Sequence, residues 1–214
     1  MKRAIVIGAT GMVGTQLIQL LMNDENYSKI ISLVRRESGI KNPKLEEHII
    51  DFDEPESWSN FVRGEVLFST LGTTIAQAKT KEAQYKVDFE YQFAVAKIAA
   101  IQGVSKYVLI SSAGSNSTSY NFYLKMKGEL ETAVHILPFK TISILKPGML
   151  AGNRIKNRPS EKLAFKVMNL LNKLGLFKRY KPIQAIIVAQ AMIMAAKENE
   201  SSRYTLDEVF KLAD

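Results

Sequence analysis

Cysteine is absent from the 214-residue chain, which excludes disulfide bonds and thiolate metal sites and suits a reducing compartment. Histidine is scarce: His48 and His135 lie far apart and match no metal-ligand spacing, so we expect no metal site. Long apolar runs are absent too. The longest, from Ala185 to Ala196, is too short to span a bilayer and contains Gln190, so it indicates a buried helix. These absences predict a cytoplasmic protein without a transmembrane segment.

The charge balance is basic, with 29 lysines and arginines against 21 aspartates and glutamates, a formal net charge of +8 at pH 7. Such a balance favours anionic partners, among them nucleotide phosphates, nucleic acid and membrane surfaces, although a merely solvated basic face is the alternative. The length suits one domain with a sizeable core and is too short for two, so we predict a single domain over residues 1–214.

Short β-branched runs alternate with longer helical patterns along the chain. We expect strands at residues 3–9, 29–36, 47–53, 65–72, 106–114 and 140–148, and a last strand with a short helix at 203–214. Helices are expected at 13–24, 87–103 and 120–131, the second ending at Gly103. This alternation predicts an α/β, doubly wound parallel sheet with helices on both faces. In such sheets, ligands bind beyond the carboxyl ends of the strands.

A glycine-rich turn, GATGMVG, follows the first expected strand and opens the first helix. Gly8 permits a tight turn, Gly11 lets the backbone approach a pyrophosphate, and Gly14 lets the helix pack closely on the strand. Backbone N–H groups and the positive helix end would hold the phosphates. The spacing differs from the G-x-G-x-x-G of dehydrogenases, and a plain strand-to-helix turn is the alternative. The context favours a dinucleotide-binding, Rossmann-type sheet, with these residues as cofactor contacts: Gly8, Thr10, Gly11, Met12, Val13 and Gly14.

The end of the second expected strand reads LVRRES and carries Arg35 and Arg36. NAD-binding sheets usually have an acidic residue there, which accepts a hydrogen bond from the ribose 2′-hydroxyl. An arginine can instead pair with the 2′-phosphate of NADP in a fork geometry. We therefore predict that NADP(H) is bound in preference to NAD(H), with Arg35 favoured as the phosphate ligand and Arg36 as the alternative.

Further motifs follow along the chain: IDFD, STLGTT, ISSAG, a tyrosine–lysine pair four residues apart, and LKPGML. Together with the glycine turn, this series resembles the short-chain dehydrogenase/reductase superfamily in its extended, epimerase-like to atypical branch. More narrowly, the stretches KVDFEYQFAVAKIAAIQGV, SSAGSNSTSYNFYLKMKGELE and KPGMLAGNR are similar to the Tat-interacting-protein group of NADP(H)-binding proteins. The resemblance covers nearly the whole chain, most firmly Lys2 to Arg154.

The resemblance implies an NADPH-dependent oxidoreductase that transfers a hydride to or from a small or moderately apolar carbonyl or alcohol. It makes Tyr123 the acid/base, and Lys127, one helical turn on, the cation that lowers the pKa of Tyr123 and binds the nicotinamide ribose. Ser112 would orient the substrate oxygen, with Ser111 as the less favoured candidate. Position implies these further cofactor contacts: Asp51 and Phe52 beside the adenine, Leu71, Gly72 and Thr73 after the fourth strand, and Pro147 and Gly148 near the nicotinamide.

Two features depart from the superfamily pattern. Asp88 stands where the family often has an asparagine, and its carboxylate would compete for Lys127. Tyr123 follows Ser112 by only 11 positions, so one wall of the substrate pocket must be small or mobile. These departures keep open a second hypothesis, a non-catalytic NADPH-binding sensor or scaffold. Arg35 argues against a third, an isomerase or dehydratase that uses tightly held NAD.

The segment 150–182 is basic and apolar at once. By its position in the superfamily, it is expected to close over the substrate as a lid. An interfacial membrane helix is the second interpretation, because lysines flank the apolar residues. Nucleic-acid binding ranks third, because the aromatic residues lack the spacing of an RNA motif. We therefore expect a small-molecule substrate, no specific nucleic-acid partner, and no closer membrane contact than surface binding; the oligomeric state is left open.

Overall fold

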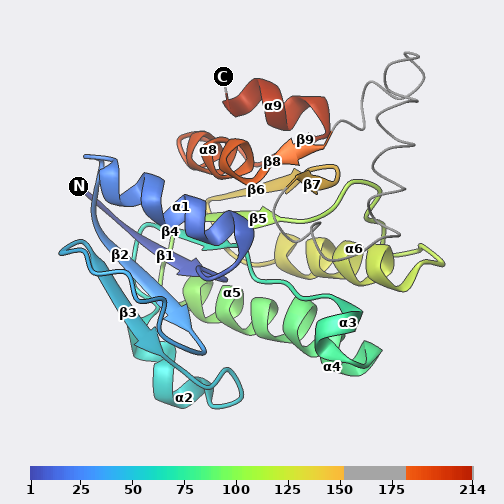
Figure 1. Cartoon of the computed structure of the whole chain (residues 1–214), viewed down its shortest axis with the longest axis horizontal. Coiled ribbons are helices and arrows are strands. Elements are labelled where there is room, and N and C mark those ends of the chain that lie inside the picture. Colours follow the sequence, from blue (N-terminus) through green and yellow to red (C-terminus); the bar gives the residue numbers. More distant parts are fainter. Residues whose placement is uncertain (152–181, 214) are drawn as a thin grey trace.

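The computed structural model describes residues 1–151 and 182–213. Seven of its strands are β1 (Lys2–Ile7), β2 (Tyr27–Val34), β3 (Leu45–Ile49), β4 (Val66–Ser69), β5 (Lys106–Ile110), β6 (Thr141–Lys146) and β9 (Ser202–Thr205). All neighbouring pairs are parallel, and the strands form one sheet in the order β3-β2-β1-β4-β5-β6-β9 (Figure 1). The strand order therefore reverses between β1 and β4, which is where such sheets bind ligands.

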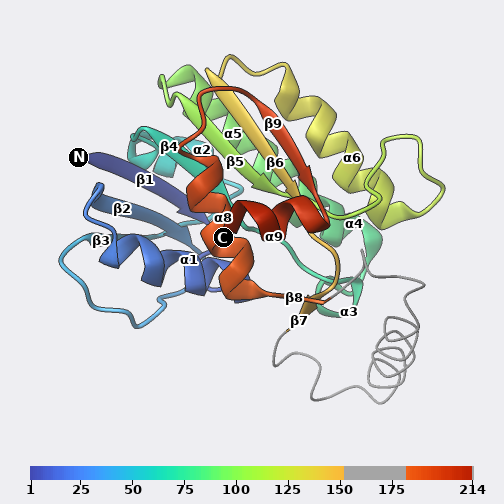
Figure 2. The ribbon, with the colours of Figure 1, turned by 90° about the horizontal axis from the view of Figure 1, so that it is seen from above.

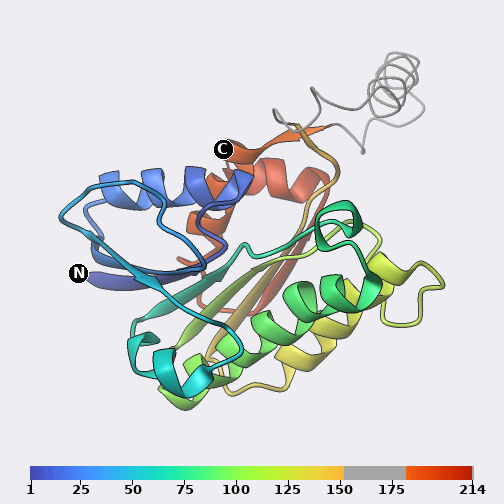
Figure 3. The same ribbon diagram turned by 60° about the horizontal axis from the view of Figure 1, so that its bottom comes forward.

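Side-chain alternation along the strands gives the sheet two cores. In β1, Ala4 and Val6 belong to one core while Ile5 and Ile7 belong to the other, and all four are fully buried. A strand that is buried on both faces needs no polar alternation, which explains the continuous apolar runs in the sequence. Figure 3 shows helices on both sides of the sheet.

One face is covered by α1 (Met12–Asn23), α8 (Ala185–Ala195) and α9 (Asp207–Ala213), and the other by α5 (Tyr91–Ile101) and α6 (Phe122–His135) (Figures 1 and 3). In α1, Val13, Leu17 and Leu21 are buried, as the helical spacing of its apolar residues predicts. α8 packs against both α1 and α9, so it is apolar nearly all round. The doubly wound α/β fold expected from the sequence is confirmed.

Shorter elements connect these layers: α2 (Pro55–Trp58), the 3₁₀ turn η1 (Ser59–Phe61), α3 (Ile75–Ala78), α4 (Lys81–Tyr85) and the π-helical turn η2 (Lys86–Glu90). α4, η2 and α5 follow one another without a break, so the helix expected at 87–103 begins earlier and contains a π turn. A separate pair of parallel strands joins β7 (Leu150–Ala151) to β8 (Ile183–Gln184).

The expected strands correspond to β1–β6 and β9, with shifted ends. The shift is clear at 47–53: β3 ends at Ile49, and the chain then turns at Asp51, whose side chain accepts a hydrogen bond from the backbone N–H of Asp53 (N···O 2.9 Å). Within residues 1–151 and 182–213, no helix has the length and apolar character needed to cross a bilayer. The lid expected at 150–182 lies outside the described residues except at its ends.

Candidate functional site

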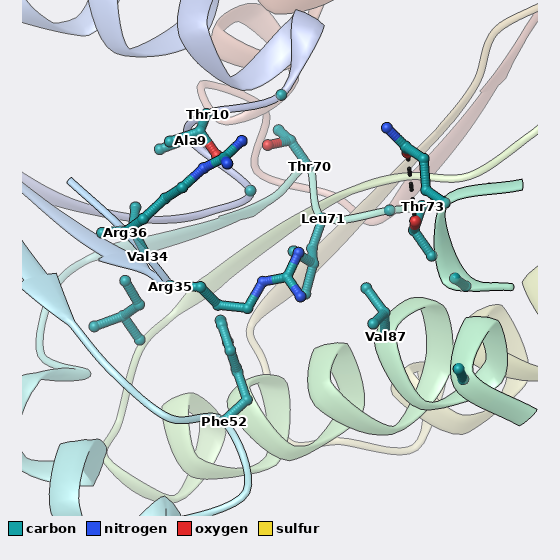
Figure 4. Close-up of a pocket in the computed structure, with 17 residues that line it drawn as sticks. Ala9, Thr10, Val34, Arg35, Arg36, Phe52, Thr70, Leu71, Thr73 and Val87 are labelled. Atoms are coloured by element: carbon teal, nitrogen blue, oxygen red, sulfur yellow. Dashed lines mark hydrogen bonds between the residues drawn. The ribbon is translucent and has the colours of Figure 1, made fainter. Parts of the chain in front are cut away.

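A cavity of about 600 Å³ opens at the carboxyl ends of β1, β2 and β4, beside the reversal in strand order (Figure 4). Its volume lies within the ~300–1,000 Å³ typical of small-molecule sites. Segments far apart in the sequence meet there. The lining residues are Gly8, Ala9, Thr10, Gly11, Leu33, Val34, Arg35, Arg36, Phe52, Thr70, Leu71, Gly72, Thr73, Gln77, Ala78, Ala83 and Val87.

The glycine turn after β1 forms one wall of the cavity. Gly8 has φ +81°, and a Cβ on it would lie 2.5 Å from the backbone nitrogen of Leu71, so a side chain is excluded there. A Cβ on Gly14 would overlap the carbonyl oxygen of Gly8. α1 begins at Met12 and has no acidic residue in its first turn, which leaves its positive end available to an anion. This close backbone approach beside a helix N-terminus fits the pyrophosphate of a dinucleotide.

Two arginines at the end of β2 line the next part of the cavity, and both are exposed. Figure 4 shows Arg36 extending along the glycine turn toward Thr10, whereas Arg35 reaches across toward Leu71. A guanidinium group is well suited to a phosphate, because its N–H donors match the phosphate oxygens in pairs. This end of the cavity is therefore positively charged.

Phe52 lies at the same end of the cavity and is held by its aromatic neighbours. Its ring stacks on that of Tyr91, with the centroids 5.1 Å apart, and lies 6.1 Å from the ring of Trp58. Trp58 is fully buried, and its indole N–H donates to the carbonyl oxygen of Asp51 (2.8 Å). The side chain of Asp51 instead accepts the N–H of Asp53. Of the predicted adenine-side pair, Phe52 lines the cavity and Asp51 does not.

A buried ion pair lies beside the loop after β4. Lys127 Nζ lies 3.0 Å from Asp88 Oδ1, and the two side chains are 5% and 1% exposed. The other carboxylate oxygen of Asp88 accepts the backbone N–H of Thr73 (2.7 Å). A Cβ on Gly72 would lie 3.3 Å from Asp88 Oδ1 and 3.9 Å from Lys127 Nζ. The contact between Asp88 and Lys127 expected from the sequence is present, and it ties the lysine to the cavity wall.

The π-helical turn η2 brings Asp88 to this position. The carbonyl oxygen of Asp88 accepts a hydrogen bond from Gln92 Nε2 (2.6 Å), and Gln92 Oε1 accepts one from the Ser69 hydroxyl (2.7 Å). All three side chains are buried. A π turn changes which carbonyl groups are bonded within a helix, and such turns are frequent at functional sites. Here it is anchored to the end of β4 through two buried side chains.

Tyr123 and Lys127 stand one turn apart on α6, and Lys127 Nζ lies 6.0 Å from the centroid of the Tyr123 ring. Tyr123 is 37% exposed whereas Lys127 is buried. The pair therefore shares one helix face, with the phenol reaching solvent and the ammonium held inside by Asp88.

The two serines after β5 have different surroundings. The Ser111 hydroxyl is buried and donates to the carboxylate of Glu131. The Ser112 hydroxyl is half-buried, and its contact with the carbonyl oxygen of Ala113 is long, at 3.4 Å. A hydroxyl engaged by a buried carboxylate is poorly placed to bind a substrate, so this geometry favours Ser112 over Ser111.

Several predicted site residues lie outside the cavity lining. Met12, Val13 and Gly14 form the start of α1, and Val13 and Gly14 are buried behind the turn. Pro147 and Gly148 follow β6, where the carbonyl oxygen of Pro147 accepts the N–H of Ala113 (3.0 Å). The predicted residues that line the cavity are Gly8, Thr10, Gly11, Arg35, Arg36, Phe52, Leu71, Gly72 and Thr73, while Ser112, Tyr123 and Lys127 lie beyond its edge.

Sequence reasoning missed part of the lining. Ala9, Leu33, Val34 and Thr70 adjoin predicted positions, and extending each motif by one or two residues would have found them. Gln77, Ala78, Ala83 and Val87 come from α3, α4 and η2, and nothing in their chemistry marks them as ligand contacts.

A family model described as HIM1 matches residues 19–181 of the chain. Among curated relatives, Protein FMP52, mitochondrial, of Saccharomyces cerevisiae is 36% identical, over 73% of this chain and 69% of its own length. Protein FMP52-1, mitochondrial, of Scheffersomyces stipitis is 32% identical, with coverages of 92% and 88%. Protein FMP52, mitochondrial, of Coccidioides immitis is 31% identical, with coverages of 91% and 85%.

These names overturn the expected cytoplasmic location, because each of the three relatives is named as a mitochondrial protein. The expectation rested on missing cysteines and missing apolar runs. Both absences restrict disulfides and helical membrane spans, but neither distinguishes one aqueous compartment from another.

Solved structures share the fold. UDP-glucose 4-epimerase of Thermus thermophilus, in complex with NAD, has a TM-score of 0.71 and 14% identity over 99% of this chain and 81% of its own. A short-chain dehydrogenase/reductase superfamily protein of Agrobacterium tumefaciens with bound NAD has a TM-score of 0.71 and 12% identity, over 94% of this chain and 76% of its own. Helicobacter pylori ADP-L-glycero-D-manno-heptose-6-epimerase has a TM-score of 0.69 and 19% identity, over 96% of this chain and 76% of its own. At these identities, the likeness concerns the fold alone.

Proposed function

The chain belongs to the HIM1 family and has the fold of the short-chain dehydrogenases/reductases, and on this basis we propose that it is an NADPH-dependent oxidoreductase. Its substrate would be a small or moderately apolar carbonyl or alcohol. The observation that carries the proposal is the cavity in which the glycine turn and both arginines meet at the carboxyl edge of the sheet. When bound there, a nicotinamide cofactor would supply or accept the hydride.

NADPH is the proposed cofactor because of the charge of the cavity wall. Arg35 and Arg36 both line it, and among the lining residues that the structure describes there is no aspartate or glutamate. An NAD site usually places a carboxylate at the end of the second strand, where it accepts the ribose 2′-hydroxyl. Arg35 remains the favoured ligand of the 2′-phosphate, with Arg36 beside it as the alternative.

Proton transfer at the substrate oxygen is assigned to Tyr123, because a carbonyl that receives a hydride must also receive a proton. Lys127 would donate hydrogen bonds to the nicotinamide ribose, since its ammonium lies against Gly72 at the cavity wall. Asp88 balances the charge of Lys127, so the lysine acts here mainly as a hydrogen-bond donor. Ser112 would orient the substrate oxygen with its available hydroxyl.

Two finer assignments accompany this function. The likeness of residues 111–131 to the Tat-interacting-protein group supports an atypical reductase rather than a sugar-nucleotide epimerase. The names of the fungal relatives support a mitochondrial location for this chain as well.

Cofactor binding and turnover can be tested separately. Titration with NADPH, followed by nicotinamide fluorescence, measures binding, and a panel of nitrobenzaldehyde, cyclohexanone and phenanthrenequinone measures turnover. Tyr123→Phe is expected to bind NADPH normally and to lose about 10²- to 10⁴-fold in turnover. Tyr120→Phe is the matched control: this tyrosine lies three residues away, is fully exposed, and should be dispensable. Turnover that survives Tyr123→Phe would remove the mechanism, and absence of dinucleotide binding would remove the function.

A cofactor-dependent sensor or scaffold is the second candidate function. One observation favours it: the pairing of Lys127 with Asp88, which weakens the electrostatic support for a proton donor at Tyr123. Tight NADPH binding without turnover of any carbonyl in the panel would decide for this second function.

A further inference from the structure

A second buried charge cluster lies on α6, eight residues beyond Tyr123. Glu131 is 6% exposed. One of its carboxylate oxygens accepts hydrogen bonds from the hydroxyls of Ser111 and Ser115, and the other lies 3.1 Å from Lys146 Nζ. A buried carboxylate needs such partners, because an unpaired charge would lose its hydration without compensation. The reaction proposed above uses none of these four side chains.

Lys146, the last residue of β6, brings a third element into the cluster. Its ammonium donates to the backbone carbonyl oxygen of Ser115 (3.0 Å) as well as to Glu131 (3.1 Å). Figure 2 shows α6 at the end of the sheet formed by β5, β6 and β9, and α6 shares one hydrophobic core with β6. The cluster therefore joins α6, β6 and the loop after β5.

The loop joined in this way is segment 111–117, which carries Ser112. The Ser115 N–H donates to the carbonyl oxygen of Ser112 (3.0 Å), and Gly114, with φ +79°, completes this tight turn. Ser112 opens the turn, and Ser115 closes it. Glu131 thus accepts a hydrogen bond from the hydroxyl of Ser115, and Lys146 donates one to its carbonyl oxygen.

A third attachment holds the far end of the same segment. A Cβ on Gly128 would overlap the backbone nitrogen of Ser117, so the loop lies directly on the backbone of α6. The Asn116 N–H also donates to the carbonyl oxygen of Leu124 (3.1 Å). Segment 111–117 is therefore held on both sides of the turn against the helix that carries Tyr123.

We propose that Glu131 and Lys146 are positioning residues that hold the Ser112 hydroxyl in register with Tyr123, and so set the orientation of the substrate oxygen. The inference rests on the proposed function, in which Ser112 and Tyr123 share that oxygen. Neither charged group touches the cofactor cavity, so the pair acts on substrate turnover and leaves cofactor binding alone.

Two variants test this proposal. Glu131→Gln removes the charge, and Glu131→Leu/Lys146→Met replaces the whole pair by apolar groups, a change that often leaves the stability of a protein intact. Both are expected to bind NADPH as the wild type does and to lose about 10- to 100-fold in kcat/KM, since small misplacements of a reacting group cost that much. Glu129→Gln is the matched control, because Glu129 lies on the same helix in a more exposed pair with Lys125 (3.9 Å) and should be silent.

The partner through which Glu131 acts is tested by combining variants. In a Ser112→Ala background, Glu131→Gln should cause no further loss, because the hydroxyl that it positions is already gone. If the fold-losses of Ser112→Ala and Glu131→Gln multiply in the combined variant, the proposal is overturned. The proposal is also overturned if Glu131→Leu/Lys146→Met folds and turns over substrate like the wild type.

Amide hydrogen exchange separates this proposal from the proposed function. Glu131→Gln should speed exchange within segment 111–117 while leaving β1 and α1 protected, whether or not any carbonyl is turned over. If the wild type reduces no carbonyl but this loop loosens in the variant, the enzyme assignment fails and the positioning role of the pair stands. Unchanged exchange in the loop overturns the positioning role itself.

Discussion

Replacing Asp88 by alanine should destabilise the fold strongly, because it leaves a buried cation alone. Lys127, 5% exposed, would lose the carboxylate that lies 3.0 Å away, and the N–H of Thr73 would lose its acceptor. Removing one partner of a buried ion pair costs about 3–5 kcal/mol. In a chain of 214 residues, each kcal/mol lowers Tm by about 2–4 °C, so the expected drop is about 6–20 °C.

The assay is thermal unfolding of four proteins, followed by circular dichroism: wild type, Asp88→Ala, Lys127→Met and the double variant. The double variant removes both charges together and should recover most of the loss. The Asp53–Lys86 pair provides the control, since it has the same chemistry and a similar separation of 2.8 Å, but its side chains are 49% and 44% exposed. Asp53→Ala should therefore leave Tm nearly unchanged.

Two results would refute the reasoning. One is an Asp88→Ala variant that loses no more stability than Asp53→Ala. That result would mean that burial does not determine how much the Asp88–Lys127 pair contributes to stability. The other is a double variant that is as unstable as the two single losses added together. Additivity would show that Asp88 and Lys127 stabilise the fold through separate contacts rather than through each other.

Three further substitutions probe the charge of the cavity, its glycine turn and the buried core. Arg35→Asp should weaken NADPH binding about 10- to 150-fold and NADH binding far less, the ratio being measured by titration; a larger loss for Arg36→Asp would assign the phosphate to Arg36 instead. Gly8→Ala should abolish dinucleotide binding because its Cβ would lie 2.5 Å from the Leu71 nitrogen, whereas Gly39→Ala, at φ +76° with open space around it, should bind normally despite the same backbone strain. Burial raises the pKa of the Tyr107 phenol well above its usual value, so this phenol ionises at a lower pH in the unfolded chain than in the folded one. The free energy of unfolding should therefore fall above about pH 10, by about 1.4 kcal/mol per pH unit. Urea unfolding measured across this pH range should show a shallower fall for Tyr107→Phe.

The layered fold could be predicted because its signals are local. β1 is an apolar run followed by Gly8, and α1 repeats apolar residues at helical spacing. Each element can therefore be recognised from a short stretch of sequence. The carboxyl ends of the strands then had to converge on one edge of the sheet. That convergence placed Arg35 and Gly72 on one cavity although they are 37 positions apart.

What escaped prediction depends on contacts between distant segments. α3 and α4 are single turns that apolar spacing cannot reveal, yet they contribute Gln77 and Ala83 to the cavity. In the π turn η2, the carbonyl oxygen of Asp88 accepts a hydrogen bond from the buried side chain of Gln92, a contact that local propensity does not encode. The pairing of Glu131 with Lys146 likewise arises when β6 meets α6, and neither residue stands out in its own stretch of sequence.

Trp58 is the only tryptophan in the chain, and it is fully buried, with its ring 6.1 Å from that of the cavity residue Phe52. All indole emission therefore originates from one dry position at the edge of the cofactor cavity. Reduced nicotinamide absorbs light in the range where tryptophan emits, so an occupied cavity should dim this emission by energy transfer. If the cavity binds NADPH as proposed, the fluorescence of Trp58 should therefore report cofactor binding in an unlabelled sample.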